Sequence, residues 1–392
     1  MTKDTLFQYA EAHKDPFIEL SDYIYDHPEI GFQEFKACAA ITDLLERSGF
    51  TVERNIADIK TAFRATYENG SSGPAIGLLC EYDALENIGH ACSHHLQSPI
   101  IALAAIALKE ELHDRPFKLI IYGTPAEEGI GGKITMVDRG CFRDVDVTLM
   151  VHGWDHTFVD VRSYAMNQFK VHFYGKAAHA ALCPYEGKSA FDALLLAFQG
   201  IEFLREHVHD TCRMHYTVLD AGGPANVVPA HASGHFILRS FSNRQVQEME
   251  ERFRSIVKGA ALMADVDYEI QAEPQYIAKI PAYKLNDLMI ENAKLAGAKR
   301  IIPPIEEAGS TDYANVMYLA PGAVIRLAFT QVGDTPHTDG MLKAGKSADA
   351  HQAIVTGAQI ITGVCYDLIT DPEKLQEVKE DFRQSKEKAL SV

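Results

Sequence analysis

The feature that most constrains the fold is an alternation of short apolar segments with helical segments, which begins at Ala75. Residues 74–82 (PAIGLLCEY) are typical of a buried strand, and residues 98–112 (SPIIALAAIALKEEL) are typical of a helix. Two more strands are predicted. One is the apolar segment at the beginning of residues 117–128, and the other is the apolar segment of residues 146–154. Strands that alternate with helices predict an α/β domain, with a central sheet and flanking helices.

The middle of the chain follows a different order. Between residues 163 and 276 the pattern predicts strand, helix, strand, strand, helix and strand. This βαββαβ order is the ferredoxin-like split arrangement, and it makes a complete small domain. We therefore predict a discontinuous α/β domain of residues 1–162 and 278–392, with an inserted domain of residues 163–277. The first ~50 residues are predicted to be helical, and the chain is predicted to end in a long charged helix.

Composition narrows the class of protein. Of the 392 residues, 47% are hydrophobic and 23% are charged, as is typical of globular proteins. A formal net charge of -17 argues against a nucleic-acid partner, because nucleic acids usually bind a basic face. The near-continuous apolar stretches are shorter than the roughly 20 residues that span a membrane, and the N-terminus has no signal-peptide core. Seven cysteines without regular spacing predict no disulfide framework, so we expect a reducing, cytoplasmic location and no membrane partner.

Two groups of candidate catalytic residues directly follow predicted strands. The segment GHACSHHL, residues 89–96, holds three histidines and one cysteine, which are ligands that transition metals prefer. A buried cysteine beside histidines at a helix start explains this segment equally well. Glu127 and Glu128 are neighbouring carboxylates whose repulsion a cation would relieve, so one can bind a metal while the other acts as a base on bound water. A solvated turn is the alternative interpretation of this pair.

Two further histidines complete the set. His152 ends the last predicted strand, and His337 lies in a polar loop near the C-terminus. Each histidine taken alone is more often structural than catalytic. Together with the cysteine–histidine segment and the acidic pair, however, they predict a hydrolase with two metal ions about 3.5–4 Å apart, because such a site needs ligands from several loops.

Six motifs in a fixed order resemble the M20 peptidase family. The motifs are HPEIGFQEF, CEYDALENIGHACSHH, PAEEGIGGK, GKAAHAA, PANVVPAHA and GSTDYANV. They are similar to the amidohydrolase branch, subfamily D, which includes the aminobenzoyl-glutamate hydrolase and the N-acyl-amino-acid and auxin-conjugate hydrolases. The resemblance extends from about His27 to His337, and it implies that the inserted domain is a dimerisation domain.

The resemblance also implies roles for individual residues in the catalytic domain. Glu127 would be the general base. Asp83 would contact the metal ligands, and not the metals themselves, and so hold the ligands in position. The family pattern is Cys-Gly-His-Asp/Asn, but here Ser93 replaces the glycine and His95 replaces the Asp or Asn. These two differences affect the hydrogen bonds that orient the metal ligands. The implied metal ligands are Cys92, His94, Glu128, His152 and His337.

Other matched positions concern the substrate. His179 matches a histidine that reaches the active site of the neighbouring subunit. Asn226 and Arg239 match positions that touch the substrate amide or carboxylate, and the guanidinium fork of Arg239 suits a carboxylate. A surface ion pair is the alternative role for Arg239. The turn formed by Gly309, Ser310 and Thr311 matches a segment that lines the substrate pocket, although a plain turn would have the same composition.

The resemblance thus implies a metal-dependent amidohydrolase, which cleaves the amide bond of N-acyl or N-aroyl amino acids with a metal-bound water activated by Glu127. It implies two divalent ions per subunit, zinc or manganese, and a homodimer or higher homo-oligomer. The expected partner is a small-molecule N-acyl amino acid or dipeptide. Two alternatives are a dipeptidase or exopeptidase on the same scaffold, and a non-catalytic metal-binding protein. Retention of Glu127 argues against the second alternative, because a structural metal site needs no free base.

Overall fold

The computed structural model describes residues 2–129 and 131–391, and their contacts divide the chain into two compact units. The larger unit comprises the residues up to Ser163 together with Lys279–Ser391, and the smaller unit is Tyr164–Ala278. The larger unit is therefore discontinuous in sequence, with boundaries one residue from the predicted ones.

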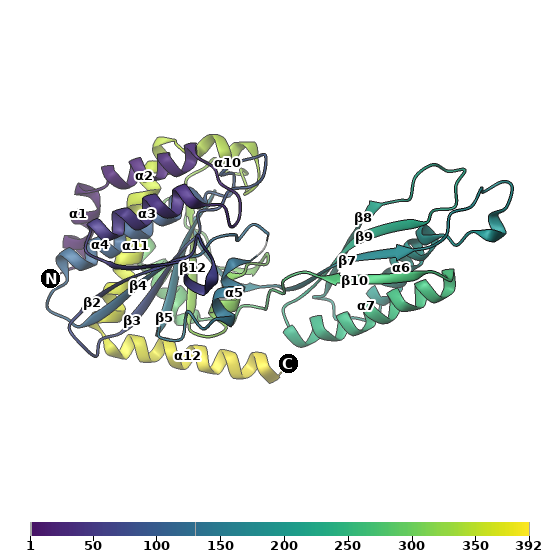
Figure 1. The fold of residues 1–392 in the computed structure, drawn as a ribbon. Helices are drawn as coiled ribbons and strands as arrows, with labels where there is room; N and C mark the ends of the chain where they lie inside the picture. The colour runs from purple at the N-terminus through teal and green to yellow at the C-terminus, as the bar shows by residue number, and fades with distance from the viewer. Residues whose placement is uncertain (1, 130, 392) are drawn as a thin grey trace. The chain divides into compact units, whose positions relative to one another are not determined.

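An eight-stranded sheet forms the centre of the larger unit (Figure 1). Its strand order is β1-β2-β4-β3-β5-β12-β6-β11. Strands β4, β3, β5 and β12 are parallel to their neighbours in this run, so their carboxyl ends meet at one edge of the sheet. The strands are β1 (Thr51–Arg54), β2 (Phe63–Asn69), β3 (Ala75–Cys80), β4 (Phe117–Gly123), β5 (Val147–Trp154), β6 (Phe158–Ser163), β11 (Ile305–Ala308) and β12 (Gly322–Ala328).

Helices cover both faces of this sheet, as the α/β prediction requires. One face carries the main core, and α5 and α9 pack with the second core on the other face. The helices of the main core are α1 (Lys3–Ala12), α2 (Asp15–Asp26), α3 (Phe35–Arg47), α4 (Gln97–Glu111), α8 (Tyr283–Leu295), α11 (Ala348–Thr370) and part of α12 (Pro372–Ser391). The shorter helices are α5 (Gly132–Asp138), α9 (Tyr313–Met317) and α10 (Asp339–Ala344), and α10 adds Met341 to the main core. The predicted fold class is confirmed.

Helix α11 is longer than the apolar stretches expected from the sequence. Its 23 residues are apolar enough to cross a membrane by length and composition alone. However, 83% of its most apolar window is buried, and the helix packs against α1, α4 and α8. A helix that is apolar all round and enclosed by other elements is typical of a protein core.

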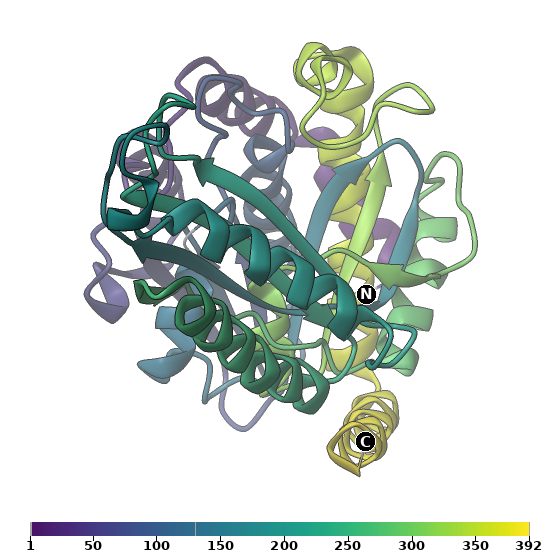
Figure 2. The same ribbon diagram turned by 90° about the vertical axis from the view of Figure 1, so that its right-hand side faces the viewer.

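The smaller unit has the predicted βαββαβ order, so this part of the prediction is confirmed. Its four strands form an antiparallel sheet in the order β10-β7-β9-β8. Helices α6 and α7 lie side by side on one face of that sheet (Figure 2), and the other face is open and polar. The elements are β7 (Ala165–Tyr174), α6 (Ala190–Arg205), β8 (Arg213–Asp220), β9 (His231–Ser240), α7 (Asn243–Ala264) and β10 (Asp267–Ala272).

The sequence of α7 explains why this segment is helical and which face it buries. The Ser242 hydroxyl accepts a hydrogen bond from the Gln245 backbone N–H at 3.4 Å, which caps the first turn. Val246, Met249 and Phe253 are spaced three and four residues apart, so they share one face and are buried against the sheet.

Candidate active site

The residues predicted to bind metal come together at the edge of the larger sheet where the parallel strands end. Cys92 and His94 lie in the connection that follows β3, and Glu128 follows β4. His152 is near the end of β5, and His337 lies in the loop after β12. Ligands and catalytic groups in α/β sheets usually occupy this edge, because several loops meet there.

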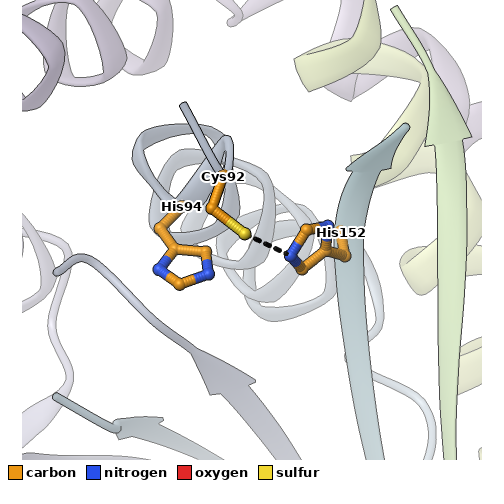
Figure 3. Close-up of side chains that lie close together, drawn as sticks. All are labelled: Cys92, His94 and His152. Carbon is orange, nitrogen blue, oxygen red and sulfur yellow. Dashed lines mark hydrogen bonds between the residues drawn. The ribbon is translucent and has the colours of Figure 1, made fainter. Parts of the chain in front are cut away.

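One cluster consists of Cys92, His94 and His152, which are all buried (Figure 3). The Cys92 sulfur lies 3.5 Å from Nε2 of His152. One sulfur or nitrogen atom from each residue falls within 4.8 Å of those of the others. A thiolate and two imidazoles are a typical ligand set for zinc and other transition ions.

Two further clusters share members with the first. Cys92 also groups with Glu128 and His337, and Nε2 of His337 lies 3.2 Å from a Glu128 carboxylate oxygen. His94 also groups with Glu127 and Glu128, at 4.0 and 3.9 Å from Nε2 to the two carboxylates. Because the clusters share Cys92 and His94, their donors form one contiguous site, and together they are numerous enough for the two neighbouring metal ions predicted from the sequence.

Two buried atoms show that metal ions fit this site. Nε2 of His94 and Oε1 of Glu128 are among the buried side-chain atoms of the described residues that make no hydrogen bond, although Nε2 of His94 lies 3.3 Å from Oε2 of Glu81. Such atoms are costly unless something binds them, and a cation would bind both. The far nitrogens of the rings are already engaged: Nδ1 of His94 lies 3.2 Å from Asp83 Oδ1, and Nδ1 of His152 lies 2.9 Å from the Gly153 carbonyl. Each Nε2 is therefore directed to the cluster.

Asp83 lies where the sequence predicted a supporting residue. One of its carboxylate oxygens contacts the His94 ring, and the other accepts a hydrogen bond from the Glu128 backbone N–H at 2.9 Å. One buried carboxylate therefore positions two of the predicted ligands.

The neighbouring glutamates have opposite electrostatic environments. Burial and the nearby Glu81 and Asp312 carboxylates raise the pKa of Glu127 well above its ordinary value. Burial also acts to raise the pKa of Glu128, but the hydrogen bond from His337 and the charge of His94 bring this pKa below its ordinary value. Glu128 is thus held ionised, as a ligand must be, whereas Glu127 is suited to taking up a proton.

A buried ion network that the sequence analysis missed lies next to Glu127. The Lys133 ammonium donates to Glu81 Oε1 and to Asp312 Oδ1, both at 2.6 Å, and all three side chains are at most 1% exposed. Glu81 also accepts from the Gln97 side chain at 2.7 Å. Glu81, Lys133 and Asp312 lie inside three of the six motifs. The signal in the sequence was a lysine directly after the glycines of PAEEGIGGK, where a helix begins.

The structure shows what surrounds Ser93 and His95, the two residues that depart from the family motif. Ser93 stands where the family has glycine, and its backbone is left-handed with φ 64°, a conformation that favours glycine. Its hydroxyl donates to the Cys92 carbonyl, which offsets part of this strain. His95 belongs to none of the ligand clusters, because its Nε2 lies 2.9 Å from the Gly345 carbonyl. Both departures leave the ligand side chains in place.

The predicted substrate residues fall into both units. Gly309, Ser310 and Thr311 form the loop between β11 and α9, directly before the buried Asp312. In the smaller unit, His179 and Asn226 lie in adjacent turns, joined by a hydrogen bond from the Ala180 N–H to the Asn226 carbonyl at 3.0 Å.

Arg239, the third predicted substrate residue of the smaller unit, is on β9 and is partly buried. Burial lowers the pKa of its guanidinium, although nearby Tyr164 and Tyr276 act in the opposite direction. Its role at the substrate stays a prediction, like those of His179 and Asn226.

The fold and the ligand clusters define a metallohydrolase built on an α/β sheet. Residues 163–264 match the peptidase dimerisation domain family. The chain is 30% identical over 387 residues to the Xaa-Arg dipeptidase of Homo sapiens, covering 93% of this chain and 88% of that protein. It is also 30% identical over 450 residues to a polypeptide of the p-aminobenzoyl-glutamate hydrolase of Escherichia coli (strain K12), covering 95% of this chain and 93% of that protein.

Solved structures share the fold. A dinuclear metal-binding peptidase of the M20 family from Bacillus subtilis superposes with a TM-score of 0.70 at 19% identity, over 92% of this chain and 99% of that one. An aminobenzoyl-glutamate utilization protein from Klebsiella pneumoniae superposes with a TM-score of 0.69 at 21% identity, over 92% and 98%. The chain therefore belongs to the M20 peptidase family, and it is a hydrolase acting on C–N bonds.

Proposed function

We propose that the protein is a two-metal amidohydrolase that removes an N-acyl or N-aroyl group from an amino acid. The observation that carries this proposal is the position of Glu127. Its carboxylate lies 4.0 Å from Nε2 of His94 and is next in sequence to Glu128, which faces the same ligand clusters. A carboxylate with a raised pKa beside a ligand set is the group that a hydrolase needs to move a proton.

In this proposal each residue of the site has its own role. Two divalent ions bound there would polarise the substrate carbonyl and lower the pKa of water. Cys92, His94, Glu128, His152 and His337 would hold these ions, zinc or manganese. Glu127 would take the proton from the attacking water and give it to the departing amine. Asp83 would keep His94 in the orientation that presents Nε2.

Two relatives support the choice of substrate class. The names Xaa-Arg dipeptidase and p-aminobenzoyl-glutamate hydrolase share one feature, an amide whose nitrogen belongs to an amino acid. We propose that this protein also acts on such amides, and that Arg239 binds the carboxylate of the amino acid. Asn226 would bind the amide, and the turn from Gly309 to Thr311 would line the pocket.

We further propose that the protein is a homodimer formed through its smaller unit. Strand β8 is an eight-residue edge strand, and such an edge is a template for pairing with a second chain. Large apolar side chains are exposed on β8 and α6, with Leu219 51% and Phe203 67% exposed. Pairing would cover both features.

The environment of His179 supports a role in the partner's active site. Its Nδ1 accepts from the backbone N–H groups of Ala181 and Leu182 at 3.2 and 3.3 Å. The proton of the neutral ring is therefore on Nε2, and the residue is exposed. His179 thus presents a hydrogen-bond donor outward, as stabilisation of a carbonyl oxygen requires.

A substrate panel tests this function. N-acetyl, N-benzoyl and p-aminobenzoyl amino acids are compared with dipeptides of the same C-terminal residue, with zinc and with manganese. We expect the highest kcat/KM for an N-acyl or N-aroyl amino acid, and a large loss when its carboxylate is amidated. If dipeptides have the highest kcat/KM, the dipeptidase alternative is correct. If no amide is cleaved with either metal, the proposal is wrong.

A further inference from the structure

The open face of the smaller sheet carries a chain of three polar side chains. Nδ1 of His172 on β7 lies 3.3 Å from Nε2 of His231 on β9. Nδ1 of His231 in turn lies 2.6 Å from Oδ2 of Asp220, the last residue of β8. These residues come from three different strands, and none belongs to the catalytic ligand clusters.

A backbone irregularity places Asp220 on this face. Val218 pairs with Gly234, but the next pair in the register is Asp220 with Ser233, so Leu219 is an extra residue. Without this bulge Leu219 would pair with Ser233 and face the histidines. Bulges commonly redirect a side chain at functional sites, and here a carboxylate replaces a leucine beside His231.

The Asp220 carboxylate determines which nitrogen of the neutral His231 ring carries the hydrogen. Because Asp220 accepts a hydrogen from Nδ1, the neutral ring has its lone pair on Nε2, which faces His172. Asp220 is itself held by the Gly222 backbone N–H at 3.0 Å. A carboxylate behind the far nitrogen of a histidine is the usual arrangement for a metal-binding imidazole, since it fixes the tautomer and raises the basicity of the ligand nitrogen.

We propose that His172 and His231 form a second metal site, separate from the catalytic ligands, for a divalent transition ion such as zinc. Two nitrogens at zinc–nitrogen distances of about 2.0–2.1 Å in tetrahedral geometry lie about 3.3–3.4 Å apart. The observed separation is 3.3 Å. The ion takes the place of the proton that the two nitrogens otherwise share, and Asp220 orients His231 from behind.

The surroundings favour a cation. Glu269 pairs with His172 across β10 and β7, and its carboxylate accepts from the Tyr174 hydroxyl at 3.1 Å. Two carboxylates, those of Asp220 and Glu269, therefore flank the histidines. Because the cluster is solvent-exposed, water completes the coordination, and the ion exchanges more readily than one held in a closed four-ligand site.

Zinc stoichiometry of the full-length protein tests this site. After equilibrium dialysis against free Zn²⁺, wild type is expected to bind one more ion per chain than His231→Gln or His172→Gln. Asp220→Asn is expected to weaken the additional site about 10- to 100-fold, because it removes the orienting carboxylate. Comparing each variant with wild type isolates this site, because the catalytic ligands are unchanged in every variant.

His215→Gln is the matched control. His215 lies on the adjacent strand β8, where burial and then the nearby Arg239, Arg205 and Arg213 lower its pKa. Because these cations would repel a metal ion, this variant should bind as much zinc as wild type. Equal melting temperatures in chelator would establish that the variants are folded. If folded His172→Gln and His231→Gln both bind as much zinc as wild type, there is no second site.

Discussion

Glu127 and Glu128 are adjacent in sequence and differ only in what surrounds them. The Glu128 backbone N–H donates to Asp83, and the Glu128 carboxylate pairs with His337. Glu127 faces the carboxylates of Glu81 and Asp312. Two identical side chains thus acquire different proton affinities, and in the proposed mechanism this difference separates a ligand from a base.

Glu127→Gln tests that separation. We expect turnover to fall by about 10²–10⁴-fold or more, because the amide cannot accept the proton of the attacking water. Metal content should stay near that of wild type, because the five predicted ligands are unchanged. Metal analysis and kcat measured on the same preparation check both expectations. Glu86→Gln, at an exposed position in the same loop region as the ligands, is the control and should retain full activity.

Lys133→Met tests the buried network beside the base. Removing the ammonium leaves Glu81 and Asp312 as uncompensated buried charges, so we expect a loss of about 3–5 kcal/mol in the free energy of unfolding. Denaturant unfolding of the larger unit measures this loss. Lys118→Met removes a partly exposed pair with Asp144 and should cost about 1 kcal/mol or less.

A second substitution distinguishes charge from shape in this network. If Lys133 acts as a counter-ion, adding Asp312→Asn to Lys133→Met should restore part of the lost stability, because one of the unpaired charges is removed. An unchanged or lower stability of the double variant would mean that the packing of the lysine chain, and not its charge, stabilises this region.

Among the strands of the larger sheet, those that precede the predicted ligands were predicted better from the sequence than the others. Three of the four parallel strands that end at the site, β3, β4 and β5, are continuous apolar runs, as expected of strands buried on both faces. The fourth, β12, was not singled out, because Arg326 interrupts its apolar run. Four more strands were not singled out either, because they are short and lie toward the two edges of the sheet: β1, β2, β6 and β11. The order of strands in the sheet is set by tertiary packing.

Some residues of the candidate site could likewise be predicted from the sequence, and others could not. The cysteine, histidines and acidic pair were predicted because thiolate, imidazole and carboxylate are metal ligands that stand out in any sequence. Lys133 and Glu81 were not, because their importance comes from burial and from each other, and neither property is visible before the chain is folded. The tight contact between β5 and the loop that carries Ser93 was equally invisible.

Gly153→Ala tests that contact between elements. A methyl group at Gly153 on β5 would overlap with the ring of Phe329 and with the hydroxyl of Ser93, which lies between two predicted ligands in the sequence. We expect a loss of about 1–3 kcal/mol in stability, as for other overpacked cores, and weaker metal binding. Gly259→Ala in α7 is the matched control: nothing lies within 4 Å of the new methyl group, so the substitution should stabilise its helix by about 0.5–1 kcal/mol. Equal effects of the two substitutions would contradict the account.

The proposed mechanism needs a second chain. The metal clusters and Glu127 belong to the larger unit, whereas His179 belongs to the smaller one. If the smaller units pair two chains, each active site takes Glu127 from one chain and His179 from the other. In a two-fold dimer both sites are then equivalent, and neither is complete in a single chain.

Mixed dimers test this arrangement. Homodimers of Glu127→Ala and of His179→Ala should both be nearly inactive. In a mixed dimer, the chain that retains Glu127 receives an intact His179 from its partner, so one of two sites is rebuilt. Random re-pairing of equal amounts makes about half of the dimers mixed, so activity should recover to about a quarter of wild type. If His179 acted within its own chain, every site would lack one of the two groups and mixing would recover nothing. Absence of recovery, with subunit exchange verified by differently tagged chains, would therefore exclude a role for His179 across the interface.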